Sequence, residues 1–138
     1  MREVILRWDL FRPDNRGLSE YVLQRLLDLQ TLVNVDYVQR HPEAPRLYES
    51  GLRYAQEGPY NEVWQGYAIM LRGEVADCED LACARAAELI ASGEDPGARA
   101  GFYGRELAID RRLYHVVVMR SDGTIEDPSR TLGMGRKR

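Results

Sequence analysis

The sequence predicts a single α+β domain that spans residues 1–138, and three observations support this prediction. Apolar residues recur at helical spacing over residues 18–39, an alanine-rich segment begins at Cys78, and short apolar runs separated by turn residues follow from residue 98. Helices that precede a run of short strands are typical of helices packed on an antiparallel sheet. A chain of 138 residues is long enough to bury its own core.

The N-terminal part of the chain predicts one strand and one long helix. Residues 4–10 are rich in β-branched and apolar residues and are expected to form a strand, followed by a turn-rich loop at 12–17. The periodic segment 18–39 predicts a long amphipathic helix, with Ser19 as a candidate N-cap. The proline-containing segment 41–45 ends this helix, because proline lacks a backbone N–H and restricts the residue before it.

The central part predicts a second major helix that begins at a cysteine. Residues 46–60 are expected to be irregular or extended, and residues 62–71 to form a short helix. The next helix is expected to run from Cys78 to about Ala91. Asp77 is its predicted N-cap, and Asp80 lies three residues later, where it can complete a capping box.

Three strands are expected after this helix. Gly93 supplies the glycine that commonly ends a helix in the left-handed conformation. The strands are predicted at about 98–103, 113–120 and 124–127, and the Cys78 helix is expected to pack on the antiparallel sheet that they form.

The charge balance argues against nucleic acid and membrane surfaces as partners. Nineteen basic and 22 acidic residues give a formal net charge of −3, so no overall positive field attracts polyanions. The basic residues at 135–138 are interpreted as a solubilising terminus. No apolar run approaches the roughly 20 residues that a membrane-spanning helix needs.

The N-terminus and the cysteines predict a cytoplasmic protein without a metal or cofactor. Residues 1–10 are too short and too charged for a signal peptide, which favours a cytoplasmic location. Cys78 and Cys83 are therefore expected to be thiols rather than a disulfide. They lie about 140° apart around a helix, and two cysteines and two histidines without paired short spacings make a structural zinc site improbable.

Three residues in order along the chain suggest covalent catalysis. Cys78 begins a helix, His115 lies in a predicted strand, and Asp127 lies at the end of the next strand. These types can serve as nucleophile, base and orienting acid. The unpaired N–H groups and the dipole of a helix N-terminus favour a thiolate and can bind an oxyanion, whereas the neighbouring acidic residues Asp77, Glu79 and Asp80 raise a thiol pKa.

The turn at residues 121–124 allows two hairpin registers, and only one of them suits a triad. A two-residue turn pairs 121 with 124 and places His115 and Asp127 on opposite faces. A three-residue loop with Gly123 in the left-handed bulge position pairs 120 with 124, so that the two side chains share one face on a diagonal. The triad hypothesis therefore requires the three-residue loop.

Each of these residues also has an ordinary structural interpretation. Free cysteine is among the most buried residue types, and Cys83 fits that description well. A histidine in a valine-rich strand is often a core residue, and Asp-Pro-Ser at 127–129 is a common turn. His41, beside Pro42, is interpreted as structural or solvent-exposed. The combination of Cys78, His115 and Asp127 in suitable elements favours a catalytic site over three unrelated residues.

At these positions the chain resembles the transglutaminase-like cysteine hydrolase superfamily, over about residues 60–133. The segment Ala76–Ala82 is similar to the Gly-Asp-Cys-Glu-Asp motif of bacterial transglutaminase-like proteinases, although Ala76 replaces the usual glycine. His115 and the Asp-Pro-Ser at 127–129 match the other two motifs, and Trp64 lies where these proteins often carry a tryptophan. The resemblance is greatest to small stand-alone members found among phage and prophage proteins, and it implies a papain-like core.

The function expected from these residues is hydrolysis of an amide or peptide bond through a thioester. His115 would take the Cys78 proton, Asp127 would hold the imidazole tautomer, and the Cys78 N–H would bind the oxyanion, with Gln65 or Trp64 as a further donor. The substrate would be a protein or peptide. Attack by an amine instead of water would give transamidation, and the sequence does not separate the two outcomes.

Two other interpretations remain open. In the first, the chain is a transglutaminase-like module for binding or assembly, for example in a phage particle, with weak or no catalytic activity. In the second, it is a purely structural domain. The structural interpretation predicts that Cys78 is inaccessible and that His115 and Asp127 point to different faces.

Overall fold

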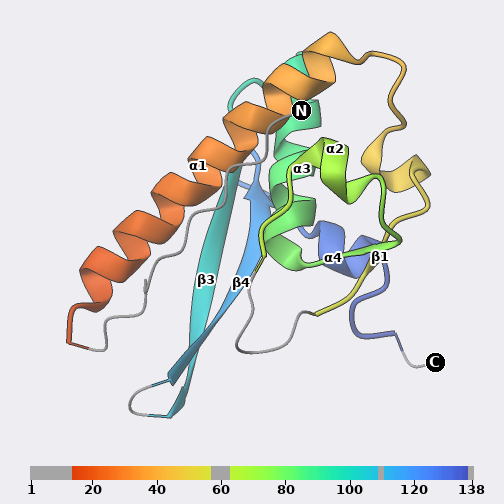
Figure 1. Cartoon of the computed structure of the whole chain (residues 1–138). Coiled ribbons are helices and arrows are strands. Elements are labelled where there is room, and N and C mark those ends of the chain that lie inside the picture. The colour runs from red at the N-terminus through yellow and green to blue at the C-terminus, as the bar shows by residue number, and fades with distance from the viewer. Residues whose placement is uncertain (1–13, 57–62, 109–110, 137–138) are drawn as a thin grey trace.

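A computed structural model describes residues 14–56, 63–108 and 111–136, and its longest element is the N-terminal helix (Figure 1). This helix, α1, spans Arg16–Arg40, which confirms the helix expected at 18–39. Its N-cap is Asn15, whose side-chain oxygen accepts the Leu18 N–H at 3.1 Å. The prediction of Ser19 as N-cap was wrong, because α1 begins one turn earlier. The strand expected at 4–10 lies outside the described residues.

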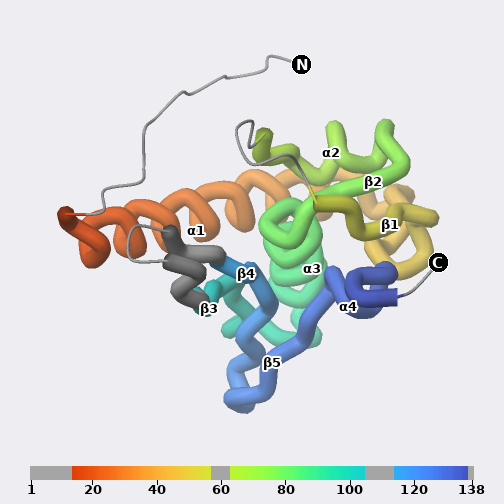
Figure 2. Tube along the Cα trace, turned by 90° about the horizontal axis from the view of Figure 1, so that it is seen from below, coloured from red at the N-terminus to blue at the C-terminus, as the bar shows by residue number. Residues whose placement is uncertain are grey.

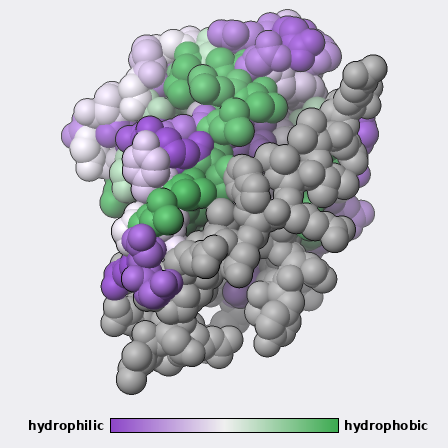
Figure 3. Space-filling model, turned by 60° about the vertical axis from the view of Figure 1, so that its left-hand side comes forward, coloured by the Kyte–Doolittle hydropathy of each residue, from purple (hydrophilic) through white to green (hydrophobic). Residues whose placement is uncertain are grey.

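The prediction that α1 is amphipathic needs a correction. Leu27 faces the core with no exposed surface, but buried Thr31 and Asn34 share that side. They can be buried because Thr31 Oγ1 donates to the Leu27 carbonyl at 2.8 Å and Asn34 Oδ1 accepts the Tyr67 N–H at 2.8 Å. Several apolar residues of α1 are exposed instead, namely Leu18, Tyr21, Leu29, Leu32 and Val33. Figure 3, which brings the α1 side forward, shows apolar surface on this face.

The described residues between the two major helices, 41–56 and 63–77, form only short elements. They are the 3-10 turn η1 (Leu47–Glu49), strand β1 (Arg53–Tyr54), helix α2 (Tyr67–Met70) and strand β2 (Val75–Ala76). The helix expected at 62–71 is thus reduced to one turn, and residue 62 lies outside the described residues. β1 and β2 pair in parallel, which brings Tyr54 opposite Ala76, two residues before Cys78.

Helix α3 spans Cys78–Ser92, as the capping signals predicted. The Asp77 side chain and the Asp80 side chain form the reciprocal capping box. Gly93 ends the helix with φ +77°, a left-handed conformation in which a Cβ would be strained.

The sheet is antiparallel and consists of β3 (Arg99–Ala108), β4 (Arg111–Met119) and β5 (Ile125–Glu126) in the order β3-β4-β5. Met119 pairs with Ile125, and the Arg120 N–H donates to the Thr124 carbonyl at 2.9 Å. Gly123 has φ +87°. These observations confirm the three-residue loop between β4 and β5. The one-turn helix α4 (Pro128–Thr131), which follows β5, was not predicted.

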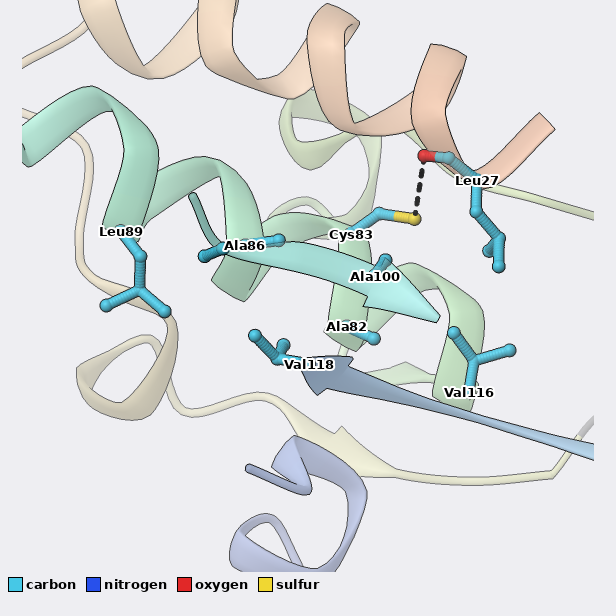
Figure 4. Close-up of a cluster of buried hydrophobic side chains, with 9 residues drawn as sticks. Leu27, Ala82, Cys83, Ala86, Leu89, Ala100, Val116 and Val118 are labelled. Atoms are coloured by element: carbon cyan, nitrogen blue, oxygen red, sulfur yellow. Dashed lines mark hydrogen bonds between the residues drawn. The ribbon is translucent and has the colours of Figure 1, made fainter. Parts of the chain in front are cut away.

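The core lies around α3, which is surrounded by α1, β4 and α4 (Figure 2). One apolar cluster joins α1, α3, β3 and β4, and it includes Leu27, Cys83, Ala100 and Val118 (Figure 4). A second cluster joins α3 to η1 and α2 on the other side. The mixed α+β class and the packing of the cysteine-bearing helix on an antiparallel sheet are therefore as expected. No helix in the described ranges is long and apolar enough to cross a membrane.

Candidate active site

Cys78 is the first residue of α3, and its backbone is held by the preceding acid. The Asp77 Oδ1 accepts the Cys78 N–H at 2.7 Å. The sequence analysis expected this N–H to bind an oxyanion, but in this structure Asp77 occupies it. The physical reason is that a helix N-terminus attracts an N-cap carboxylate, which satisfies the same donors that an oxyanion would use.

The thiol of Cys78 lies between a carboxylate and a backbone amide. Its sulfur donates to Glu79 Oε2 at 3.5 Å, and the backbone N–H of Val116 in β4 faces it. Burial raises the pKa of the Cys78 thiol well above its ordinary value; Glu79 and Asp77 raise it further, and the Val116 N–H opposes them. Of the two opposing effects named from the sequence, the negative neighbours therefore prevail over the helix N-terminus, and burial, which only the structure shows, acts in the same direction as the negative neighbours.

His115 and Asp127 meet as the three-residue loop requires. His115 Nε2 lies 2.8 Å from Asp127 Oδ2, and their side chains are only 17% and 15% exposed. The other carboxylate oxygen of Asp127 accepts the N–H groups of Ser129 and Arg130 and so caps α4. Because Asp127 binds Nε2, the ring nitrogen left for chemistry at Cys78 is Nδ1.

Cys78 lies beside the backbone next to this pair. The amide that faces its sulfur belongs to Val116, the residue that follows His115. Among the hydrogen bonds between described residues, the Cys78 thiol bonds to Glu79, and none joins it to the His115 ring. The structure thus brings His115 and Asp127 into contact and places Cys78 beside β4, the strand that carries His115. Catalytic contacts often shorten only when substrate binds.

Trp64 and Gln65 are held beside the start of α3 by Asp80. The Gln65 N–H donates to Asp80 Oδ1 at 2.7 Å, and the Gln65 carbonyl accepts from Gln30 of α1 at 3.2 Å. Trp64 is half-buried and packs against the same core cluster as Cys78. Their role as oxyanion donors stays a prediction.

Two aromatic residues near the site were missed by the sequence analysis. Tyr103 of β3 pairs with His115 of β4, and their rings meet edge to face with centroids 5.4 Å apart. Burial, followed by the negative charges at Asp77, Cys78 and other nearby acids, raises the pKa of Tyr54 to about 12. No local signal marks either residue, because each reaches the site through strand pairing between distant segments.

The potential metal ligands at the site do not amount to a metal centre. One ligand atom each from Asp77, Cys78 and Glu79 lies within 4.8 Å of the others. Each carboxylate, however, already accepts a hydrogen bond from Cys78. Adjacent acids beside a thiol do not by themselves define a metal site, and we assign none. Cys83 is a fully buried thiol that donates to the Leu27 carbonyl at 3.6 Å, in keeping with its expected packing role (Figure 4).

Comparisons with known proteins do not place the chain in a family. No family model matches it, and neither curated proteins nor solved structures yield a match. The proposed function therefore rests on the residues of the site and on their motif resemblance.

Proposed function

We propose that this protein is a cysteine-dependent hydrolase of amide or peptide bonds, with a papain-like, transglutaminase-like core. Cys78 is the nucleophile, His115 is the base, and Asp127 orients the imidazole. The observation that supports this proposal best is the 2.8 Å contact between His115 Nε2 and Asp127 Oδ2, beside a cysteine at a helix N-terminus. A protein or peptide in the cytoplasm is the proposed substrate, and neither nucleic acid nor a membrane is a proposed partner.

The proposed reaction has two halves. His115 Nδ1 accepts the Cys78 proton as the sulfur attacks the carbonyl carbon, and the same nitrogen returns a proton to the leaving amine as the C–N bond breaks. Water then attacks the thioester while His115 accepts its proton, and the thiol leaves with that proton restored. An amine in place of water would complete a transamidation.

The environment of Cys78 requires that its proton be removed during the reaction. Burial and Glu79 keep the free thiol protonated at neutral pH. A substrate bound at the start of α3 would draw Cys78 away from Glu79 and toward His115. A donor to the oxyanion would then come from Trp64, Gln65 or the Cys78 N–H after release from Asp77.

A second candidate is a weak or inactive transglutaminase-like module used for binding or assembly, as in a phage particle. The raised pKa of the Cys78 thiol and its bond to Glu79 favour this candidate. The two candidates differ in whether the reactivity of Cys78 depends on His115.

Alkylation of Cys78 by iodoacetamide, measured between pH 5 and pH 10, tests the proposal. The parent protein carries Cys83→Ala, so that Cys78 is the only thiol. We expect His115→Ala to lower the rate at neutral pH at least tenfold, because it removes the base. His41→Ala is the matched control, since His41 bonds to Glu43 at the end of α1. Equal rates in the parent and in His115→Ala would reject the hydrolase and favour the binding module.

A further inference from the structure

Glu126, the residue before Asp127, is held by three side chains, two of which come from distant parts of the chain. Its Oε2 accepts from Arg85 Nε at 2.6 Å and from the Tyr48 hydroxyl at 2.5 Å. Arg120 Nε lies 3.5 Å from Oε1. The Arg85 guanidinium also lies 4.9 Å from the centroid of the Tyr48 ring. Glu126 is thus fixed to α3 and η1 as well as to its own hairpin.

The ion pair at the centre of this cluster is largely removed from water, whereas Tyr48 is 36% exposed. The side chains of Arg85 and Glu126 are 13% and 22% exposed. Burial by itself raises the pKa of Glu126, but hydrogen bonds from Arg85 and Tyr48 outweigh this effect and hold the pKa below its ordinary value. An ion pair in this setting is more directional and less screened than an exposed one, and the loss of one partner leaves a charge without compensation.

Arg85 lies on the same face of α3 as Cys78. The two residues are seven positions apart, which is about 700° of helix rotation, and about 10 Å along the axis. At one end of this stretch Cys78 faces the backbone of β4 at Val116, and two turns later Arg85 binds Glu126. A single rigid helix therefore connects the thiol to the residue that precedes Asp127.

The strand that carries Glu126 is too short to hold Asp127 by itself. β5 consists of two residues, and it pairs with β4 only at Val118 and Met119. Asp127 follows directly and bonds to His115. Without the contacts of Arg85 and Tyr48 with Glu126, the carboxylate of Asp127 would be fixed by the two β4–β5 pairs, by the N–H groups of Ser129 and Arg130, and by the largely exposed Arg130 side chain, 3.5 Å from Oδ2.

We infer that Arg85 is a positioning residue, which acts through Glu126 to hold Asp127 on His115 at a set distance from Cys78. This inference rests on the proposed function for its consequence in catalysis. Its geometric content, that Arg85 maintains the His115–Asp127 hydrogen bond, does not require the protein to be a hydrolase.

The test removes the guanidinium but keeps its stem, with Arg85→Met in the Cys83→Ala parent. Glu126→Gln is the second variant, because it keeps the shape of the side chain if Arg85→Met folds poorly. Arg99→Met is the matched control: Arg99 also makes a short ion pair between elements, to Asp28 at 2.7 Å, but far from His115 in the β3–β4 ladder.

The first readout is the NMR signal of the His115 Nε2 proton, which a hydrogen bond to a carboxylate shifts downfield and protects from exchange. We expect this signal in the parent and in Arg99→Met. We expect it to broaden or disappear in Arg85→Met and Glu126→Gln, as in the reference variant Asp127→Ala, which has no acceptor for this proton. A signal that persists unchanged in folded Arg85→Met or Glu126→Gln would overturn the inference, whatever the activity of Cys78.

The second readout is the pH profile of Cys78 alkylation. If the proposed function is correct, Arg85→Met lowers the His115-dependent rate about tenfold to a hundredfold, because a displacement of about 1 Å at a catalytic group has an effect of that size. A purely structural role would lower the unfolding temperature and leave the pH profile unchanged. If His115→Ala leaves the parent rate unchanged, the proposed function fails, and the NMR signal still decides the positioning role.

Discussion

Glu79, the largest cause after burial, raises the pKa of the Cys78 thiol, and Glu79→Gln tests how strongly. The glutamate is 2% exposed, and its Oε2 lies 3.5 Å from the Cys78 sulfur. A negative charge at this distance opposes the formation of a second negative charge on the sulfur. Glutamine has nearly the same shape but no charge, so the substitution removes the repulsion with little change in volume. We expect the pKa of Cys78 to fall and its alkylation to accelerate.

The size of the effect follows from the distance. Two unit charges 3.5 Å apart interact by about 1 kcal/mol with water-like screening and about 5 kcal/mol at an effective dielectric constant near 20. At about 1.4 kcal/mol per unit, the pKa of Cys78 falls by about 1 to 3 units. A less basic thiolate is also a weaker nucleophile, which cancels nearly half of the gain in thiolate. The expected rise in rate near pH 8 is therefore roughly 3-fold to 40-fold.

The assay is the iodoacetamide rate between pH 6 and pH 10 in the Cys83→Ala parent. Glu94→Gln is the matched control, because it removes the same charge just beyond the far end of α3, where Glu94 is half exposed and pairs with Arg46. Its rate should equal that of the parent. An unchanged or slower rate in Glu79→Gln, with the fold intact by circular dichroism, would refute the view that the Glu79 charge restrains the thiol.

Two further predictions concern the fold. Leu27→Ala removes the fully buried α1 side chain from the core around α3. We expect it to lower the free energy of unfolding in urea by about 2–5 kcal/mol, and a loss below about 1 kcal/mol would contradict this packing. Hydrogen bonds from Ser121 lower the pKa of Asp95 in the folded protein. The ionised carboxylate therefore stabilises the fold at neutral pH. This stabilisation is lost as the pH falls through the folded pKa, which lies below the unfolded value of about 3.9. Asp95→Asn should therefore lower the melting temperature more at pH 7 than at pH 3, and equal decreases at both would count against the linkage.

Local features of this protein could be predicted because their signals lie within a few residues. Asp77 and Asp80 mark the start of α3, and Gly93 marks its end, since capping involves only adjacent backbone groups. The apolar period also predicted α1, but not which side of it is buried. Asn34 can face inward because the distant Tyr67 N–H donates to it, and Thr31 can do so because its hydroxyl donates to the Leu27 carbonyl within α1.

The candidate site could be proposed from the sequence as a set of residues, but its arrangement could not. Two hairpin registers were open at residues 121–124, and the observed loop brings Asp127 to His115. Tyr103 and Arg85 could not be found from the sequence. Tyr103 reaches His115 through the β3–β4 register, and Arg85 reaches Glu126 through the packing of α3 beside β5.

The sequence by itself determined the order of the two major helices and of the three strands of the sheet, the ends of α3, and the three residues proposed for chemistry. Only the tertiary structure decided the state of Cys78. At a helix N-terminus the dipole and the acidic neighbours act in opposite directions, and their balance depends on how much water reaches the sulfur. Packing against β4 removes that water, which strengthens the repulsion from Glu79 and leaves the thiol protonated.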